Sequence, residues 1–231
     1  RMDCFSLEHG VDADLKGRFT SLNRRNVSAF CKKLGVSENV FFLTAYNLSI
    51  GLFSNEKDTV SSSIHSGRTD SRWNRLAGPL FLTYFFRNKE GVDQTVPELL
   101  KANATQIMDT MRCYISNLHA DEMFFQYQGD ILNIDTVGGY PAERQRMQLD
   151  SLPFHLQVFT DAKGYYYELR YWENRFDTRQ LQDFLTVMEF LMDAMQEETL
   201  VRRLSRRLPD RLFPLHYTIT VEELNQAAKC Q

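Results

Sequence analysis

The sequence predicts an α/β protein in which helices pack against a mixed β-sheet. Segments with a helical spacing of apolar residues alternate along the chain with short runs rich in β-branched and aromatic residues. Two of these runs, residues 154–160 and 165–171, flank the turn-forming tetrapeptide 161–164 (DAKG), which is typical of a β-hairpin. An antiparallel hairpin in a chain that otherwise alternates helix and strand indicates a mixed sheet.

Length and composition narrow the class of protein. The chain has 231 residues, enough for one large domain or two small ones, and 43% of them are hydrophobic, which excludes a disordered chain. Its 27 basic and 30 acidic side chains give a formal net charge of -3, so nothing indicates a nucleic-acid partner. The longest uncharged stretch, residues 39–55, contains Asn, Ser and Thr and predicts a buried helix, not a membrane span. No leader suggests secretion, so a cytoplasmic location is expected.

The cysteines and histidines give no sign of a metal site. The four cysteines and five histidines are scattered, without a CxxC, HxxxH or HExxH spacing. We expect free thiols in a reducing compartment and no bound metal.

The first part of the chain predicts two helices. Residues 1–22 are polar and irregular in pattern. Over residues 23–34, apolar side chains recur three and four apart on one face, and Gly35 is a natural stop for such a helix. Ser37 then precedes a long apolar run to Phe53, which predicts a second, mostly buried helix.

Two strands with a polar loop between them come next. Residues 59–65 (TVSSSIH) are rich in β-branched side chains, and residues 67–76 are a loop with three arginines. Residues 80–87 (LFLTYFFR) are almost wholly apolar and aromatic, as in a strand buried on both faces. We therefore expect a central strand here, with Phe81 and Phe85 in the core.

A third helix is predicted over residues 97–114, with Pro97 at an early position where its missing N–H costs nothing. Its predicted buried stripe consists of Leu99, Leu100, Ile107, Met108 and Met111.

The last third adds a strand over residues 123–127 and the hairpin described above. Residues 129–150 have weak periodicity and contain Gly138, Gly139 and Pro141, so we expect an excursion from the sheet. A last helix begins at a cap on Asp177 or Thr178 and runs to about Met195. Its predicted inner face consists of Leu181, Phe184, Leu185, Met188, Phe190 and Leu191.

Three strings, in this order, resemble a known family. Residues 36–52 (VSENVFFLTAYNLSIGL) are similar to a buried family helix, and residues 62–68 (SSIHSGR) to a strand that ends in a Gly-Arg pair. Residues 78–87 (GPLFLTYFFR) match the pattern GxFVNTxxxR at Gly78, Thr83 and Arg87. The chain resembles the C-terminal half of a condensation domain from a nonribosomal peptide synthetase, in the chloramphenicol-acetyltransferase-like acyltransferase superfamily.

This resemblance covers about residues 22–205 and implies a chloramphenicol-acetyltransferase-like half-domain as the fold. It implies a lead-in segment at 1–22, a C-terminal subdomain at 23–208, and a tail or linker at 209–231. In the family, two such halves form a V and touch through a crossover, which maps onto residues 129–150. An isolated half is expected to expose apolar surface and to self-associate.

The departures from the family pattern concern the chemistry. The family's catalytic HHxxxDG motif, which lies in the N-terminal half, is absent, and no two histidines are adjacent. Leu82 stands where the family has Asn, so a polar group of the substrate tunnel is lost. His65 and His155 are the tempting substitutes for the catalytic histidine, but neither has a carboxylate at motif spacing. A structural role, with the ring hydrogen-bonded, is favoured for both.

The resemblance implies roles for six residues and none of them is catalytic. Thr83 and Leu82 would line the substrate tunnel, with an ordinary strand position as the alternative for Thr83. Gly67, Arg68, Gly78 and Arg87 would be structural, with Gly67 giving the strand freedom to turn and Arg87 anchoring a strand end by an ion pair.

The function implied is part of a condensation domain, which forms an amide bond between carrier-bound thioesters in peptide antibiotic biosynthesis. No cofactor would bind directly, since the substrates are carried on the 4′-phosphopantetheine of partner carrier domains. The expected partners are the N-terminal half of the domain and peptidyl carrier domains. The alternative is a non-catalytic module that binds carrier domains or another partner chain. A complete small acyltransferase is disfavoured because no catalytic histidine is in sight.

Overall fold

The computed structural model describes most of the chain between residues 10 and 208. The described residues are 10–66, 72, 81–89, 91, 93–112, 123–130, 136–137, 140–141, 152–197, 199–205 and 208.

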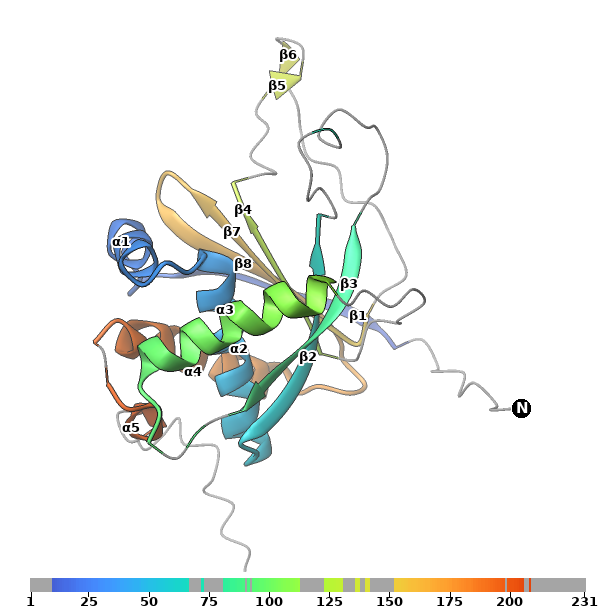
Figure 1. The fold of residues 1–231 in the computed structure, drawn as a ribbon. Helices are drawn as coiled ribbons and strands as arrows, with labels where there is room; N and C mark the ends of the chain where they lie inside the picture. The colour runs from blue at the N-terminus through green and yellow to red at the C-terminus, as the bar shows by residue number, and fades with distance from the viewer. Residues whose placement is uncertain are drawn as a thin grey trace, which may run out of the picture.

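The described strands form a mixed six-stranded sheet in the order β1-β8-β7-β4-β2-β3 (Figure 1). β4 runs parallel to both β2 and β7, and every other neighbouring pair is antiparallel. The predicted α/β class with a mixed sheet is confirmed. The strands of this sheet are β1 (Asp12–Phe19), β2 (Asp58–His65), β3 (Leu82–Lys89), β4 (Met123–Gly129), β7 (Phe154–Asp161) and β8 (Gly164–Trp172).

The described helices cover one face of this sheet, with α2 at their centre (Figure 1). α2 contacts β2, β3 and β4 below it and the helices α1, α3 and α4 around it. None of the described helices is both long and apolar enough to cross a membrane. The helices are α1 (Arg24–Leu34), α2 (Glu38–Ser54), α3 (Val96–Arg112), α4 (Thr178–Met195) and α5 (Val201–Leu204).

The helix ends lie where the capping residues predict them. The side chain of Asn23 accepts hydrogen bonds from two backbone N–H groups of α1, and Gly35 ends that helix with a left-handed φ of 72°. Ser37 caps α2 and Asp177 caps α4 in the same way, through their side-chain oxygens. The predicted starts of these three helices are confirmed.

α2 carries no charge along its buried length but several polar side chains. Thr44, Asn47 and Ser49 form hydrogen bonds, whereas no described residue bonds to the buried hydroxyl of Tyr46. Asn47 donates to the hydroxyl of Ser61 on β2 at 2.9 Å, and Thr59 donates to Asn47 at 3.3 Å. Asn103 of α3 donates to Thr44 of α2 at 3.0 Å. Buried polar groups without partners would cost about 1–3 kcal/mol each, so this network explains why an uncharged helix tolerates them.

The prediction that residues 1–22 are irregular is wrong for β1. Its residues alternate between exposed charged side chains and a half-buried row that includes Leu15 and ends in the buried Phe19. β1 pairs along its whole length with β8 and forms one edge of the sheet.

The prediction of a central strand at residues 80–87 is also wrong. β3 is the other edge of the sheet, and its inward residues alternate with half-buried or exposed ones. Of the two residues predicted in the core, Phe81 is 59% exposed and Phe85 is half-buried, whereas Phe86 is 1% exposed. Aromatic residues at both alternating positions favour burial on both faces, but among the described elements α3 covers one face of β3 and none covers the other.

α3 differs from its prediction at one position of the buried stripe. Leu99, Leu100 and Ile107 are buried, but Met108 is 56% exposed. The small strands β5 (Thr136–Val137) and β6 (Tyr140–Pro141) form a separate two-stranded ribbon that lies apart from the large sheet (Figure 1). This position agrees with the excursion predicted for residues 129–150, as far as that segment is described.

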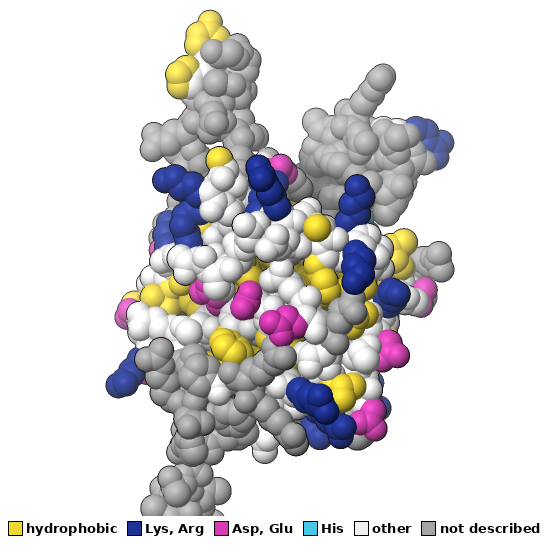
Figure 2. All heavy atoms as spheres, turned by 90° about the vertical axis from the view of Figure 1, so that its left-hand side faces the viewer, with side chains coloured by type: hydrophobic (Ala, Val, Ile, Leu, Met, Phe, Trp, Pro, Cys, Tyr) yellow, Lys and Arg dark blue, Asp and Glu magenta, His cyan; other side chains and the backbone are white. Residues whose placement is uncertain are grey.

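On the side of the molecule where α1 and α4 lie, Figure 2 shows basic, acidic and apolar side chains interspersed. The described part of this side has no broad field of one sign of charge of the kind that nucleic-acid binding requires.

Candidate functional site on the open face of the sheet

The face of the large sheet opposite the helices is here called the open face, because no described helix packs on it. Ser61, Phe125 and Phe154 pack on the helices. Because successive side chains of a strand point to opposite faces, the residues next to each of them in sequence lie on the open face. The register places one continuous row across all six strands. From β3 to β1 this row is Phe85, Ser62, Phe124, His155, Arg170 and Asp14.

A second row, one step further along the strands, is polar. Gln157 donates to Gln126 across the parallel pair β4–β7 at 3.0 Å. Next to them, Glu168 of β8 forms an ion pair with Lys16 of β1 at 3.6 Å. Polar side chains of this length on a sheet face can orient a bound chain by hydrogen bonds without any cofactor.

His155 sits near the middle of the first row. Its ring meets Phe124 edge-on at 4.8 Å, and no described residue gives its buried Nε2 a hydrogen-bond partner. Burial and the positive charge of Arg170 lower the pKa of His155 to about 4. The ring is therefore neutral at pH 7 and, with so low a pKa, a weak general base. The burial agrees with the expected structural role, but no described residue makes the expected hydrogen bond to Nε2.

His65 ends β2 and is half-buried. Burial lowers its pKa below the ordinary value. Among the described residues, no three side chains that could hold a metal ion come together. Cys31 is a free, buried thiol, and burial raises its pKa to about 12, so it is not a reactive nucleophile.

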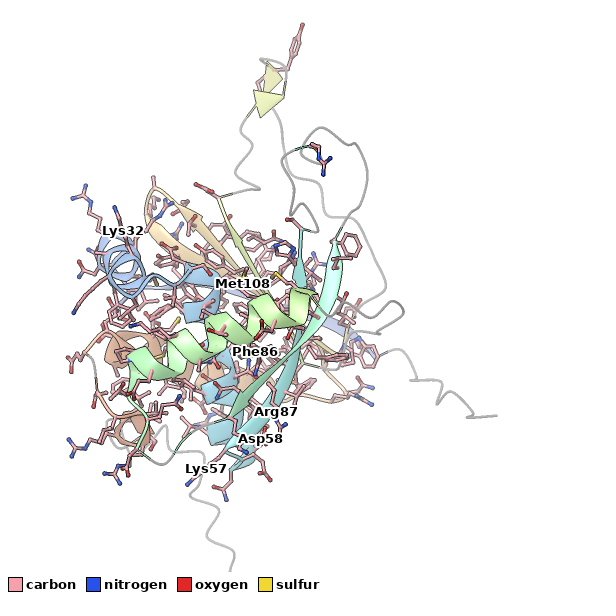
Figure 3. All side chains as sticks on the ribbon, in the orientation of Figure 1. Lys32, Lys57, Asp58, Phe86, Arg87 and Met108 are labelled. Carbon is pink, nitrogen blue, oxygen red and sulfur yellow. The ribbon has the colours of Figure 1, made fainter. Side chains whose placement is uncertain are left out.

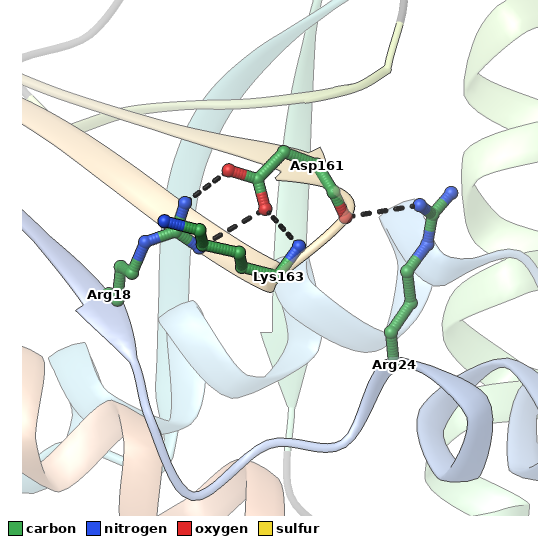
Figure 4. A network of polar contacts seen from close by, with 4 residues as sticks. All are labelled: Arg18, Arg24, Asp161 and Lys163. Atoms are coloured by element: carbon green, nitrogen blue, oxygen red, sulfur yellow. Dashed lines mark hydrogen bonds and ion pairs between the residues drawn. The ribbon is translucent and has the colours of Figure 1, made fainter.

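A hollow of about 670 Å³ opens at the corner where β1 meets the β7–β8 hairpin. Arg18 and Lys16 line it from β1, and Asp161 and Tyr166 from the hairpin. Arg18 pairs with the carboxylate of Asp161, as Figure 4 shows, and holds the pKa of that carboxyl below its usual range. The same guanidinium lies over the ring of Tyr166, 5.5 Å from its centroid.

Of the predicted tunnel residues, Thr83 lies on the open face, opposite Ile64 of β2. Leu82 is the next residue along the strand and so lies on the helix-covered face, opposite His65. Both are half-buried. The structure thus does not bring the two onto one face.

Arg87 forms the ion pair that was expected of it. Its Nε and Nη2 donate to the two carboxylate oxygens of Asp58 at 2.7 and 2.5 Å (Figure 3). This two-pronged contact ties the end of β3 to the start of β2 and holds the pKa of Asp58 below its usual range. Gly67, Arg68 and Gly78 lie outside the described residues.

Sequence reasoning missed most of the open face. Gln126, Gln157, Arg170 and the Arg18–Asp161 pair received no role, because no motif marks them. The available signal was the alternation within each strand, which separates the two faces once the register is known. Cross-strand register, however, is not readable from one sequence.

Sequence comparisons identify no relatives, whereas structural comparison does. No protein-family model matches the sequence, and no curated protein matches it significantly. A four-domain nonribosomal peptide synthetase bound to AMP and glycine superposes with a TM-score of 0.70 and 14% identity, over 83% of this chain and 17% of that one. The condensation domain of the Monacolin K polyketide synthase gives a TM-score of 0.64 at 14% identity, over 82% of this chain and 48% of that domain.

The chain has the fold of a condensation domain. It spans about half the length of the separate condensation domain that it matches. The X-domain from teicoplanin biosynthesis, solved in complex with OxyB, has the same fold, with a TM-score of 0.61 at 13% identity over 87% of this chain and 49% of that one. At these identities the likeness is one of fold, and it confirms the resemblance in fold class that the three sequence strings indicated.

Proposed function

We propose that this chain is the C-terminal half of a condensation domain and that its open face forms one wall of the tunnel in which carrier-bound thioesters meet. The observation that carries the proposal is the open face itself. No described helix covers this face, yet Phe124, Phe159 and Gln157 are buried in it, and Gln157 is bonded to the half-buried Gln126. Such a mixed surface suits a wall that contacts both a second half and a substrate.

The chemistry assigned to this half is positioning. Amide formation between two thioesters requires the amine to be held close to the carbonyl and a group that takes up its proton. The half-buried Gln126 and Thr83 would orient the extended 4′-phosphopantetheine arm and its cargo by hydrogen bonds, with the buried Gln157 holding Gln126 in place. The proton acceptor would come from the HHxxxDG motif of the other half, since His155 is buried and has a pKa of about 4.

A condensation assay tests this division of labour. The chain, incubated with aminoacyl-loaded and peptidyl-loaded carrier domains, is expected to yield no amide above the uncatalysed background. The variants His65→Gln and His155→Gln serve as matched controls and should give the same background. Amide formation by the unaltered chain, lost in either variant, would show that this chain carries its own catalytic base.

A second function has one specific observation in its favour. The X-domain from teicoplanin biosynthesis shares the fold and was solved in complex with OxyB, so the fold can serve as a platform for a partner protein. A non-catalytic module that binds carrier domains or a partner chain would use this fold without any catalytic motif. The sequence of the gene distinguishes the two functions. The first function requires an HHxxxDG motif directly upstream of this chain, and the second does not.

A further inference from the structure

The outer edge of β3 carries main-chain groups that have no described partner along part of its length. The two groups of Arg87 point away from β2, because its N–H donates to the side-chain oxygen of Gln106 at 3.1 Å and its carbonyl accepts from the side-chain nitrogen of Gln106 at 2.8 Å. Residues two and four positions away along a strand direct their groups to the same side. The N–H and C=O of Phe85 and Thr83 therefore also point outward, and no described residue bonds to them.

Gln106 thus bonds to this edge as a neighbouring strand would, and among the described contacts it does so at Arg87 alone. Its amide group supplies one acceptor and one donor to the same residue. From Phe81 to Phe85, no described residue bonds to the outward main-chain groups, and apolar side chains flank this stretch. Phe81 is 59% exposed, and Met108, which Figure 3 labels on the neighbouring α3, is 56% exposed. An open, apolar edge of this kind favours pairing with another strand.

We propose that β3 pairs edge to edge with β3 of a second copy of this chain, antiparallel about a two-fold axis at Tyr84. In this register Thr83 of each copy lies opposite Phe85 of the other. Both residues direct their main-chain groups outward, so each of these two opposed pairs exchanges two N–H···O bonds. The two six-stranded sheets then continue into one another across the axis.

The strand that pairs with residues 81–85 is that of a second copy, because this stretch of β3 is complementary to itself in the antiparallel direction. A β-branched residue, Thr83, faces an aromatic one, Phe85, which is a favourable cross-strand pair. The next residues outward place the exposed ring of Phe81 opposite the exposed guanidinium of Arg87 in the other copy, on the same face. In both copies the main-chain N–H and C=O of Arg87 are already bonded to Gln106, so the strand pairing ends at this residue. This inference is independent of the proposed function.

Sedimentation equilibrium of the full chain over a concentration series tests the pairing. The unaltered chain should show a monomer–dimer equilibrium, and Thr83→Pro should weaken it about 30-fold, because each copy loses one outward N–H and the bond that it donates. Thr83→Val, the matched control, keeps the N–H and the β-branched shape and should dimerise like the unaltered chain. A chain that stays monomeric to about 1 mM, or a Pro variant that dimerises like the Val variant, would overturn the proposal.

A second pair of variants decides the matter if the Pro variant does not fold, which near-ultraviolet circular dichroism would show. Phe81 is exposed, so its replacement leaves the core intact. Phe81→Arg places a like charge opposite Arg87 of the other copy and should weaken the dimer at least tenfold, whereas Phe81→Leu should weaken it less. Equal dimerisation of these two variants would place the contact elsewhere on the molecule.

Discussion

Among single residues, His155 shows how a buried ring can be sensitive to pH without being catalytic. Its pKa of about 4 reflects burial first and the neighbouring charge of Arg170 second. The folded chain therefore resists protonation of this ring over a range of pH in which the unfolded chain accepts the proton.

This difference predicts how stability depends on pH. Between the ordinary histidine value of 6.5 and about 4, the unfolded chain binds one more proton than the folded chain at this site, so stability falls as the pH falls. The full contribution is about 3 kcal/mol, is present above pH 6.5, and is lost by about pH 4. Urea unfolding at several pH values should show the slope, and His155→Gln should flatten it. An identical slope in both proteins would contradict the assignment.

A second residue-level prediction separates the two faces of β3. Phe86 is 1% exposed and packs under α3, so Phe86→Ala should lower the free energy of unfolding by about 3–5 kcal/mol. Phe81→Ala removes the same aromatic side chain at an exposed position, so it should lower the free energy of unfolding by less than about 1 kcal/mol. Chemical denaturation measures both, and equal losses would contradict the edge position of β3.

At the scale of elements, local signals predicted the helices better than the strands. Asn23, Ser37 and Asp177 mark helix starts through side-chain bonds to nearby N–H groups, so the sequence alone locates them. β1 was missed because Asp, Lys and Gly are poor strand formers, and it is pairing with β8 that holds it in the sheet. The edge position of β3 depends on strand order, which no local pattern contains.

The junction of α2 with the sheet depends on Glu38, which accepts hydrogen bonds from the hydroxyls of Tyr127 on β4 and Tyr165 on β8 at 2.5 and 3.0 Å. Burial, reinforced by the carboxylate, raises the pKa of both tyrosines. Glu38→Ala should destabilise the fold by about 2–4 kcal/mol, because two partly buried hydroxyls lose their acceptor. Glu38→Gln keeps an acceptor oxygen and should cost clearly less in thermal or urea unfolding. Equal losses would show that the carboxylate oxygen is not what joins these elements.

At the scale of the whole molecule, the ordered set of sequence strings predicted the fold class and the half-length match, whereas the site remained largely hidden. The motif singled out Thr83 as a tunnel residue, which stays a prediction, and the register places it on the open face. Gln126 and Gln157 meet through the parallel pairing of β4 and β7, which brings together residues about thirty positions apart. Contacts of that kind follow from topology and not from local pattern.

Under the proposed function, the open face receives the carrier-bound substrate. Nuclear magnetic resonance of the ¹⁵N-labelled chain, titrated with a carrier domain that bears its 4′-phosphopantetheine arm, tests this most directly. The same carrier without the arm is the matched control. We expect amide shifts at Thr83, Gln126 and Gln157 that appear only with the arm. Shifts confined to the helix-covered side, or shifts on the open face that are identical with and without the arm, would contradict the claim.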